Sequence, residues 1–380
     1  MKCKLEDIVD VTMGQSPKSE YYNTEGKGYP FLQGNRTFGF KYPTFDTYTT
    51  VMTKLAKAGD VIMSVRAPVG DLNITPVDMC LGRGVCSLRM KNENQDFLFY
   101  MMKYYIPHLL KKESGTVFGS VNRNDINGLE VNIPEDAQLQ KKIARYLEMI
   151  DDKIELNNAI NNNLLEQALT LYATQFSSLE FNGCIGDYCS VKSGFAFKSS
   201  WWTNCGVQVI KIGSINQDNL NLLECSYVDE DKADRAKDFV VKAGDLLIAM
   251  TGATIGKFAM VPYSSEVLLV NQRVGKFFLG NNPVEKLPFI YCTLKQPKVY
   301  GEVVNRGQGS AQPNISASDI MSIPCVIPSQ DAINDFNDMS QPLFDLIISN
   351  QRENQQLSEL RNALLPKLMS GELDVSNIDI

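Results

Sequence analysis

The residue types that most often act in catalysis or bind metals are sparse in this sequence. Its only histidine is His108, in the segment YYIPHLLKK, where a packed or surface position fits better than a base or a ligand. The nine cysteines include no Cys-x-x-Cys pair, and Cys184 and Cys189 lack the spacing and the partners of a zinc site. We therefore expect no metal site and no disulfide framework.

The motifs that hold cofactor phosphates or a flipped base are also missing. The sequence contains no G-x-G-x-x-G that opens a helix after a strand, and no G-x-x-x-x-G-K-[ST] loop. The segment TGATIG, from Thr251, lies between two expected strands, so a tight turn fits it better than a phosphate loop. The Asn/Asp-Pro-Pro-aromatic run of adenine methyltransferases is absent, and the nearest segments are NIP at Asn132 and PNI at Pro313.

A different group of side chains could make paired hydrogen bonds to base edges. Arg and Lys bind guanine in the major groove, and Asn and Gln bind adenine. Such residues gather on loops beside expected strands. In the first half they are Gln15, Lys18, Gln33, Asn35, Arg36, Arg66, Arg83, Asn122 and Arg123. In the second half they are Lys198, Lys211, Ser214, Asn216, Thr251, Lys257, Gln272, Arg273, Arg306 and Gln308.

Arg66 is the strongest of these candidates, because it follows a strand in SVRAPVG beside Pro68 and Gly70. The segment NRGQGS at 305–310 indicates a flexible loop that could become ordered on DNA. Trp201 and Trp202 could present an aromatic ring to a base, but core positions are more usual for tryptophan. For every candidate, an ordinary solvated side chain is the alternative.

The bulk composition indicates a globular chain of two units. It has 380 residues, of which 44% are hydrophobic and 21% charged. A charged N-terminus and the absence of a long apolar run favour a cytoplasmic protein. The net charge of −7 argues against nucleic acid, but residues 331–380 hold three basic and nine acidic residues and so account for most of it.

Two halves of the sequence repeat each other. KAGDVIMSVRAPVG, from Lys57, resembles KAGDLLIAMTGATIG, from Lys242, and LEDIVDVTMG, FLQGN and NRNDINGLEVNIP have counterparts in the same order. Apolar and β-branched runs predict strands at 60–65, 84–90, 244–250 and 266–274, and helices are expected at 96–112 and 287–296. Each half is therefore expected to be a mixed α/β globule.

Each half ends in a heptad pattern that predicts a long helix of about 35 to 40 residues. The first seam consists of Ile143, Leu147, Ile150, Ile154, Asn157, Asn161, Leu164, Ala168 and Leu171. The second consists of Phe336, Ser340, Leu343, Ile347, Asn350, Asn354, Leu357, Arg361 and Leu364. Asparagine in a seam costs stability but fixes register and partner, so the two helices are expected to pair. Solvent-facing asparagines on irregular helices are the alternative.

These observations predict an α+β protein with a pseudo-twofold internal repeat, in which two similar domains are separated by two long helices. The helices would form an antiparallel coiled coil. The expected boundaries are 1–136 and 179–330 for the globules, 137–178 for the first helix, and 331–380 for the second helix and tail. Such a layout suits a long ligand with two sites at a fixed spacing, as on duplex DNA.

The sequence resembles the specificity subunits of type I restriction-modification systems over essentially its whole length. The matching segments are MGQSPKSEYYN, GDVIMSVRAPVGDLNI, SGFAFKSS, GDLLIAMTGATIGK, QPNISASDI and LLPKLMSGELDV. The resemblance implies two target recognition domains that each bind half of a bipartite double-stranded DNA site. It also implies helices that space them and dock two modification methyltransferase subunits, which restriction subunits then join. S-adenosylmethionine, Mg²⁺ and ATP would serve those partners, and this chain would be non-catalytic.

Three alternatives stay open at this point. The chain could serve a fused restriction-methylation enzyme of a related type. It could be a scaffold that binds only proteins through its helices. It could also be a self-sufficient methyltransferase, for which the sequence offers the least support.

Overall fold

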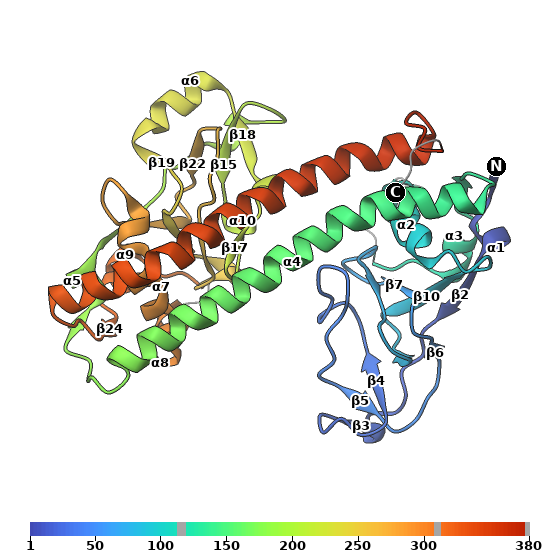
Figure 1. Cartoon of the computed structure of the whole chain (residues 1–380), viewed down its shortest axis with the longest axis horizontal. Helices are drawn as coiled ribbons and strands as arrows, with labels where there is room; N and C mark the ends of the chain where they lie inside the picture. Colours follow the sequence, from blue (N-terminus) through green and yellow to red (C-terminus); the bar gives the residue numbers. More distant parts are fainter. Residues whose placement is uncertain (112–118, 308–312, 377–380) are drawn as a thin grey trace. The chain divides into compact units, whose positions relative to one another are not determined.

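A computed structural model describes residues 1–111, 119–307 and 313–376. Unit 1 comprises Met1–Asp152 and Ser358–Ile380, and unit 2 comprises Lys153–Leu357. Two long helices, α4 (Ala137–Phe176) and α10 (Gln330–Ser370), appear in green and red in Figure 1 and give residues to both units. Although they are 40 and 41 residues long, no helix in the described ranges is apolar enough to span a membrane.

Unit 1 is built on two sheets, with the strand orders β2-β10-β7-β8 and β3-β5-β4-β9-β6, and on the short pair β1-β11. The strands are β1 (Lys2–Lys4), β2 (Val9–Met13), β3 (Tyr22–Asn23), β4 (Tyr29–Leu32), β5 (Tyr48–Thr49), β6 (Leu55–Ala56), β7 (Val61–Ser64), β8 (Leu72–Ile74), β9 (Met79–Leu81), β10 (Val85–Met90) and β11 (Glu130–Asn132). The helices, besides the long ones, are α1 (Leu5–Ile8), the 3-10 turn η1 (Ser19–Tyr21), α2 (Gln95–Lys111) and α3 (Arg123–Asn127).

The core of unit 1 lies between the first sheet and helix α2. All four residues of the central strand β7 are buried. A strand that is covered on both faces has a continuous apolar sequence, which is the pattern that predicted it. Phe97 and Met101 of α2 share one hydrophobic cluster with Val61 and Met63.

Unit 2 repeats this topology strand for strand. Its sheets have the orders β13-β23-β20-β21 and β14-β18-β15-β22-β19, and its short pair is β12-β24. The strands are β12 (Gly183–Cys184), β13 (Ser190–Ser193), β14 (Trp202–Thr203), β15 (Val207–Ile210), β18 (Ser226–Val228), β19 (Val240–Val241), β20 (Leu246–Ala249), β21 (Phe258–Met260), β22 (Leu268–Val270), β23 (Val274–Phe278) and β24 (Pro324–Cys325). In both units the second sheet has one parallel pair, β4 with β9 and β15 with β22. The internal repeat therefore extends to strand pairing.

The remaining elements of unit 2 include an inserted hairpin, β16 (Ile215–Asn216) and β17 (Asn219–Leu220). The helices are α5 (Ile185–Tyr188), η2 (Ser199–Trp201), η3 (Ile212–Ser214), η4 (Leu222–Glu224), α6 (Glu230–Ala233), η5 (Asp234–Phe239), η6 (Gly252–Thr254), η7 (Pro283–Glu285), α7 (Leu287–Lys295), α8 (Pro297–Gly307) and α9 (Ala317–Met321). TGATIG is the expected tight turn between two strands.

The repeated KAGD segment is a turn that starts the central strand of each unit. The carboxylates of Asp60 and Asp245 each accept a hydrogen bond of 2.9 Å from the backbone N–H three residues earlier. Asp60 also pairs with Arg89 on β10 at 2.6 Å, and Asp245 pairs with Lys276 on β23 at 2.5 Å. The aspartate of the repeated segment thus has a structural role in both units, because a buried carboxylate must be paired.

Two expectations about secondary structure were wrong. The single strand expected at 266–274 is divided, since a turn at Asn271 separates β22 from β23. The flexible loop expected from 305 is in part the end of helix α8, in which Val299 and Val303 are buried at helical spacing. Position 307 needs glycine, because a Cβ there would lie 2.2 Å from the Ile255 side chain.

The long helices contact each other within each unit. In unit 1, Ile143 and Leu147 of α4 share a cluster with Leu365, Leu368 and Met369 of α10. In unit 2, the cluster joins Ala168, Tyr172 and Phe176 of α4 to Phe336, Phe344 and Ile347 of α10. Every position of the two predicted seams is buried or half-buried.

The seam asparagines bond to each other across the two helices in unit 2. Asn157 Nδ2 donates to Asn354 Oδ1 at 2.9 Å, and Asn350 Nδ2 donates to Asn161 Oδ1 at 2.8 Å. Asn157 is 1% exposed and Asn350 is 8% exposed. The alternative of solvent-facing asparagines is therefore wrong for these two residues.

Candidate nucleic-acid interface

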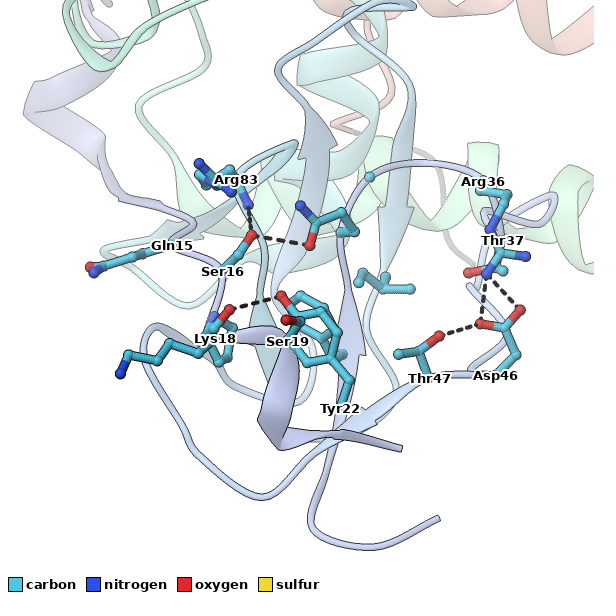
Figure 2. A pocket seen from close by; sticks show the side chains of 15 residues that line it. Gln15, Ser16, Lys18, Ser19, Tyr22, Arg36, Thr37, Asp46, Thr47 and Arg83 are labelled. Atoms are coloured by element: carbon cyan, nitrogen blue, oxygen red, sulfur yellow. Dashed lines mark hydrogen bonds and ion pairs between the residues drawn. The ribbon is translucent and has the colours of Figure 1, made fainter. Parts of the chain in front are cut away.

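Unit 1 has a pocket of about 830 Å³ that brings five of the predicted DNA contacts together (Figure 2). These five residues come from three loops and are Gln15, Lys18, Gln33, Arg36 and Arg83. The loops follow β2, β4 and β9. Ser16, Tyr22, Thr37, Asp46 and Thr47 line the same pocket.

The three loops meet because glycines let their backbones approach closely. A Cβ at Gly14 would lie 2.0 Å from the Gly82 carbonyl oxygen, and a Cβ at Gly84 would lie 2.4 Å from that of Gln33. Gly84 N–H donates to the Gln33 carbonyl at 2.9 Å. The sequence therefore needs glycine here to hold Gln33 and Arg83 side by side.

Ser16 orients the polar groups of this pocket. Its hydroxyl donates to Gln33 Oε1 at 3.1 Å and accepts from the backbone N–H of Arg83 at 3.1 Å. The amide oxygen of Gln33 is engaged in this bond, and the Gln33 side chain is exposed at the pocket. Gln15, Lys18 and Arg83 are exposed at the pocket.

Arg36 forms a two-bond ion pair with Asp46 across the pocket. Its Nη2 lies 2.8 Å and 2.7 Å from the two carboxylate oxygens. Hydrogen bonds from Arg36 and then Thr47 lower the pKa of Asp46. Both partners are exposed, so the pair is weak enough to exchange for another acceptor.

The other candidates of unit 1 lie outside this pocket. Asn35 donates to Asp71 at 2.5 Å, and exposed Arg66 forms an isolated backbone bridge with Ser120. The Asn122 side chain caps α3, and the Arg123 guanidinium donates to the Val11 carbonyl. These last two side chains have roles in the fold, which their sequence pattern did not reveal.

In unit 2 the corresponding place holds an aromatic cluster, formed by Phe195, Phe197, Trp201, Trp202 and Phe239. Phe195 stacks on Trp201 with ring centroids 6.2 Å apart, and Trp202 packs against Phe197 at 5.5 Å. Both tryptophans are half-buried, so they are partly core residues and partly surface residues.

Two predicted lysines lie on this cluster. Lys211 Nζ is 3.6 Å from the Trp202 ring centroid, and Lys198 Nζ is 5.7 Å from that of Trp201. Burial lowers the pKa of Lys211. Cations over indole faces are stabilised by the ring quadrupole, which fixes these ammonium groups at the surface.

The remaining candidates of unit 2 are dispersed. Gln272 and Arg273 are exposed on the turn before β23, Asn216 is exposed on β16, and Lys257 and Thr251 are half-buried. Two others have roles in the fold: Ser214 is buried and donates to the Glu224 carbonyl, and Arg306 donates to Ser322 Oγ at 2.6 Å. Gln308 lies outside the described residues.

Sequence reasoning missed Ser16 and Asp46, because a serine or an aspartate in a loop carries no local signal of its partner. It also missed a buried charged group around Lys41 and Asp151. In the part of the chain that the structure describes, no group of three or more His, Cys, Asp or Glu could hold a metal ion.

Comparisons with known proteins agree on one family. The family model described as "Type I restriction modification DNA specificity domain" matches residues 1–166 and 181–359. A Methanocaldococcus jannaschii protein, described as a type I restriction enzyme MjaX specificity subunit, is 40% identical over 153 residues. That match covers 40% of this chain but only 36% of the relative.

Two further matches span the whole chain. The type I restriction enzyme MjaIX specificity subunit of the same organism is 23% identical, over 99% of this chain and 94% of its own length. The crystal structure of a type I restriction-modification system S subunit from M. genitalium aligns with a TM-score of 0.54 and 16% identity, over 99% and 96% of the two chains. The latter likeness concerns the fold alone.

Proposed function

The chain belongs to the family of type I restriction-modification DNA specificity domains, as a DNA-recognition subunit without catalysis of its own, and we propose that each of its units binds half of a bipartite target. The target in this proposal is double-stranded DNA. The repetition of strand order in the two units supports two recognition domains of one kind.

The unit 1 pocket carries this proposal. Guanidinium, ammonium and amide groups from three loops converge on one concave surface. Arg83, Arg36 and Gln33 are residue types that make paired hydrogen bonds to base edges, whereas Lys18 suits a phosphate. The aromatic cluster of unit 2, with Lys198 and Lys211 on it, offers a different chemistry for the second half-site.

We propose that α4 and α10 form an antiparallel coiled coil that sets the gap between the half-sites. The asparagine pairs 157–354 and 161–350 support this, since they match one register and leave an amide unsatisfied in any other. The ion pair of Lys153 with Glu353 at 3.2 Å joins the same two helices.

The same helices would dock two modification methyltransferase subunits, to which restriction subunits are added. Each long helix also has exposed apolar residues at heptad spacing, which support a further contact with a helix of a partner subunit. They are Met149 and Leu156 on α4, and Met339, Leu346 and Leu360 on α10, between 45% and 55% exposed. S-adenosylmethionine, Mg²⁺ and ATP are assigned to those partners.

A binding experiment on the complex with its modification subunits tests the proposal. Methylation-motif sequencing of cells with and without the gene first gives the two half-sites and their gap. Scrambling either half-site in a duplex should weaken binding at least 1,000-fold relative to the intact site. A scaffold that binds only proteins would show no sequence preference at any salt concentration.

A further inference from the structure

The loop between β4 and β5, residues 33–47, connects the unit 1 pocket to the long helices. It carries Gln33 and Arg36 at its beginning and Asp46 at its end, all of which line the pocket. In its middle, Lys41 is only 3% exposed. A buried lysine on a surface loop must have partners, because an unpaired buried charge is costly.

The backbone beside Lys41 is fixed to strand β8. Gly39 N–H donates to Asn73 Oδ1 at 3.0 Å, and Asn73 Nδ2 donates back to the Gly39 carbonyl at 3.0 Å. The Lys41 carbonyl accepts from the Ile74 N–H at 2.8 Å. Asn73 is fully buried, and these bonds join this part of the loop to the edge strand of the first sheet.

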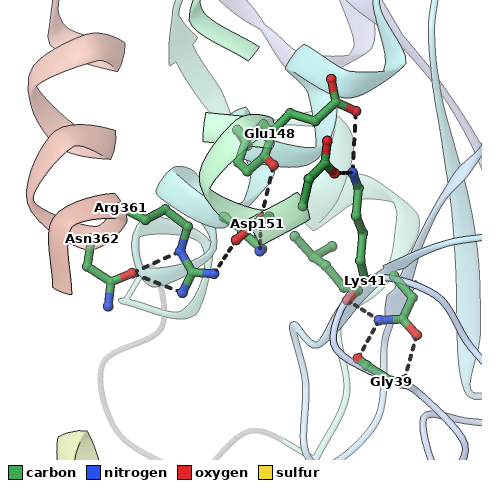
Figure 3. Close-up of polar contacts among 11 residues, drawn as sticks. Gly39, Lys41, Glu148, Asp151, Arg361 and Asn362 are labelled. Atoms are coloured by element: carbon green, nitrogen blue, oxygen red, sulfur yellow. Dashed lines mark hydrogen bonds and ion pairs between the residues drawn. The ribbon is translucent and has the colours of Figure 1, made fainter. Parts of the chain in front are cut away.

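The side chain of Lys41 reaches helix α4. Its Nζ lies 3.4 Å from a Glu148 oxygen and 3.5 Å from an Asp152 oxygen (Figure 3). Burial opposes the charge, but Tyr42, Glu148 and Asp152 together raise the pKa of Lys41 above its usual value. The ammonium form is therefore the form that holds the loop.

A second charged group continues this contact to α2 and α10. Asp151, which is fully buried, accepts from Tyr100 at 2.9 Å and pairs with Arg361 at 2.6 Å and Lys103 at 3.4 Å. Lys103 and Arg361 each lie 5.8 Å from the ring centroid of Phe40, next to Lys41 in the loop.

Unit 2 holds the equivalent loop through a carboxylate instead. Its loop between β15 and β18, residues 211–225, presents Asp218 at the tip of the inserted hairpin. The carboxylate pairs with Lys295 of α7 at 2.5 Å and accepts from Tyr291, and the Asp218 carbonyl accepts from Gln351 of α10 at 2.9 Å. In unit 2 the charged contact is thus with α7, and a neutral hydrogen bond to the Asp218 backbone joins the loop to the long helix α10.

We propose that Lys41 and Asp218 are positioning residues for DNA recognition, each fixing the DNA-contact loop of its own unit through its charged side chain, Lys41 to the long helix α4 and Asp218 to α7. This inference rests on the proposed function. It assigns to α4 and α10 a part in aiming the base-contacting side chains, beyond spacing and docking. Neither residue touches DNA in this scheme.

Hydrogen exchange on the free chain tests the positioning role without DNA. Lys41→Met keeps an unbranched side chain of nearly the same length and removes its charge, and it should speed amide exchange in residues 33–47 about tenfold. Lys41→Arg should leave exchange near the wild-type rate. Unchanged exchange in Lys41→Met overturns the role of Lys41, whatever the DNA results are.

DNA binding by the complex with its modification subunits tests the consequence. Lys41→Met should reduce discrimination against single-base changes about five- to tenfold in one half-site only, and Asp218→Asn should do so in the other. Equal losses in both half-sites, or equal weakening on matched and mismatched DNA, would contradict the proposal. If Lys41→Met unfolds unit 1, Glu148→Gln removes one partner of Lys41 and replaces it in both measurements.

The two measurements separate this inference from the proposed function. If Lys41→Met speeds amide exchange in residues 33–47 but the complex shows no sequence preference, the result counts against DNA recognition. It does not count against the attachment of the loop to α4. Normal sequence preference with normal exchange in both variants would overturn the positioning role alone.

Discussion

At the end of strand β2 unit 1 carries Gln15, and at the end of β13 unit 2 carries Phe195. The backbone is the same at both places, since Gln15 N–H donates to the Leu81 carbonyl at 2.9 Å and Phe195 N–H donates to the Val270 carbonyl at 2.8 Å. Gln33 and Lys211 likewise follow the equivalent strands β4 and β15. One backbone scaffold thus presents amides in one unit and aromatic rings with cations in the other.

This difference teaches that the repeat conserves geometry and not ligand chemistry. A carboxamide offers a donor and an acceptor in one plane, which suits a base edge. An indole with an ammonium group on its face suits a sugar, a phosphate or an unstacked base. We therefore expect the two half-sites to differ in sequence and the two units to differ in how much of their binding depends on base contacts.

The largest expected effect comes from shortening the connection between the units. Deleting residues 153–159 of α4 together with 352–358 of α10 removes one heptad from each helix, keeps the outer registers, and spares Asp152 and Gln351. Binding at the original gap should fall at least 100-fold, because the two units can no longer engage their half-sites together.

Methylation-motif sequencing of this deletion variant should show both half-site sequences unchanged and a new gap between them. Deleting 153–159 alone is the control, because it mismatches the two helices. An unchanged gap in the matched variant would refute the idea that the helices set the spacing.

Arg66→Ala sharpens the comparison at a second equivalent pair, Arg66 and Thr251. Each forms an isolated backbone bridge, to Ser120 and to Asn314 respectively. Loss of the guanidinium should weaken binding by about 1 to 3 kcal/mol and relax discrimination at one base position of one half-site. An unchanged recognition profile would remove Arg66 from the DNA-contact set, and Thr251→Ala is the matched control in unit 2.

Asp46→Asn should strengthen binding by unit 1. In the free protein Arg36 is engaged by Asp46, and a guanine must displace that carboxylate before it can bind the same guanidinium. Exposed ion pairs contribute up to about 1 kcal/mol, so the gain should be up to about fivefold in affinity. The double variant with Arg36→Gln should show no gain, and weaker binding by Asp46→Asn alone would show that the pair is needed to hold Arg36 in place.

The sequence was sufficient to predict what depends on neighbouring residues or on repetition. The strand at Val61–Ser64, helix α2 and the facing asparagines all follow from periodicity and from the repeat. Two of the failures, helix α8 and the burial of Lys41, have one physical cause, which is that a decisive contact joins residues far apart in the chain. Helix α8 is stabilised by packing on Ile255, and Lys41 is buried by carboxylates from α4.

In the candidate site, too, features set by neighbouring residues could be predicted and contacts with distant residues could not. The types and loops of Gln33 and Arg83 were evident from strand ends, so they could be proposed and were found in one pocket. Asn122, Arg123, Ser214 and Arg306 had the same local appearance, yet their side chains bond to the fold. No pattern within a loop distinguishes a side chain that faces outward from one that caps a helix.

The smallest expected effect concerns Lys18 and Lys198, which occupy the same position after β2 and β13 and carry the same charge in both units. Because they share a residue type where their neighbours differ, phosphate contact is the role that fits both. Lys18→Gln and Lys198→Gln should each reduce the slope of log K against log salt by about 1, with the base preferences of both half-sites unchanged. The slopes are measured by titration between about 50 and 200 mM salt, on matched and single-base-changed duplexes. If Lys198→Gln altered base preference while Lys18→Gln altered only the slope, the ammonium group on Trp201 would be a base contact, and the two units would differ even where their sequences agree.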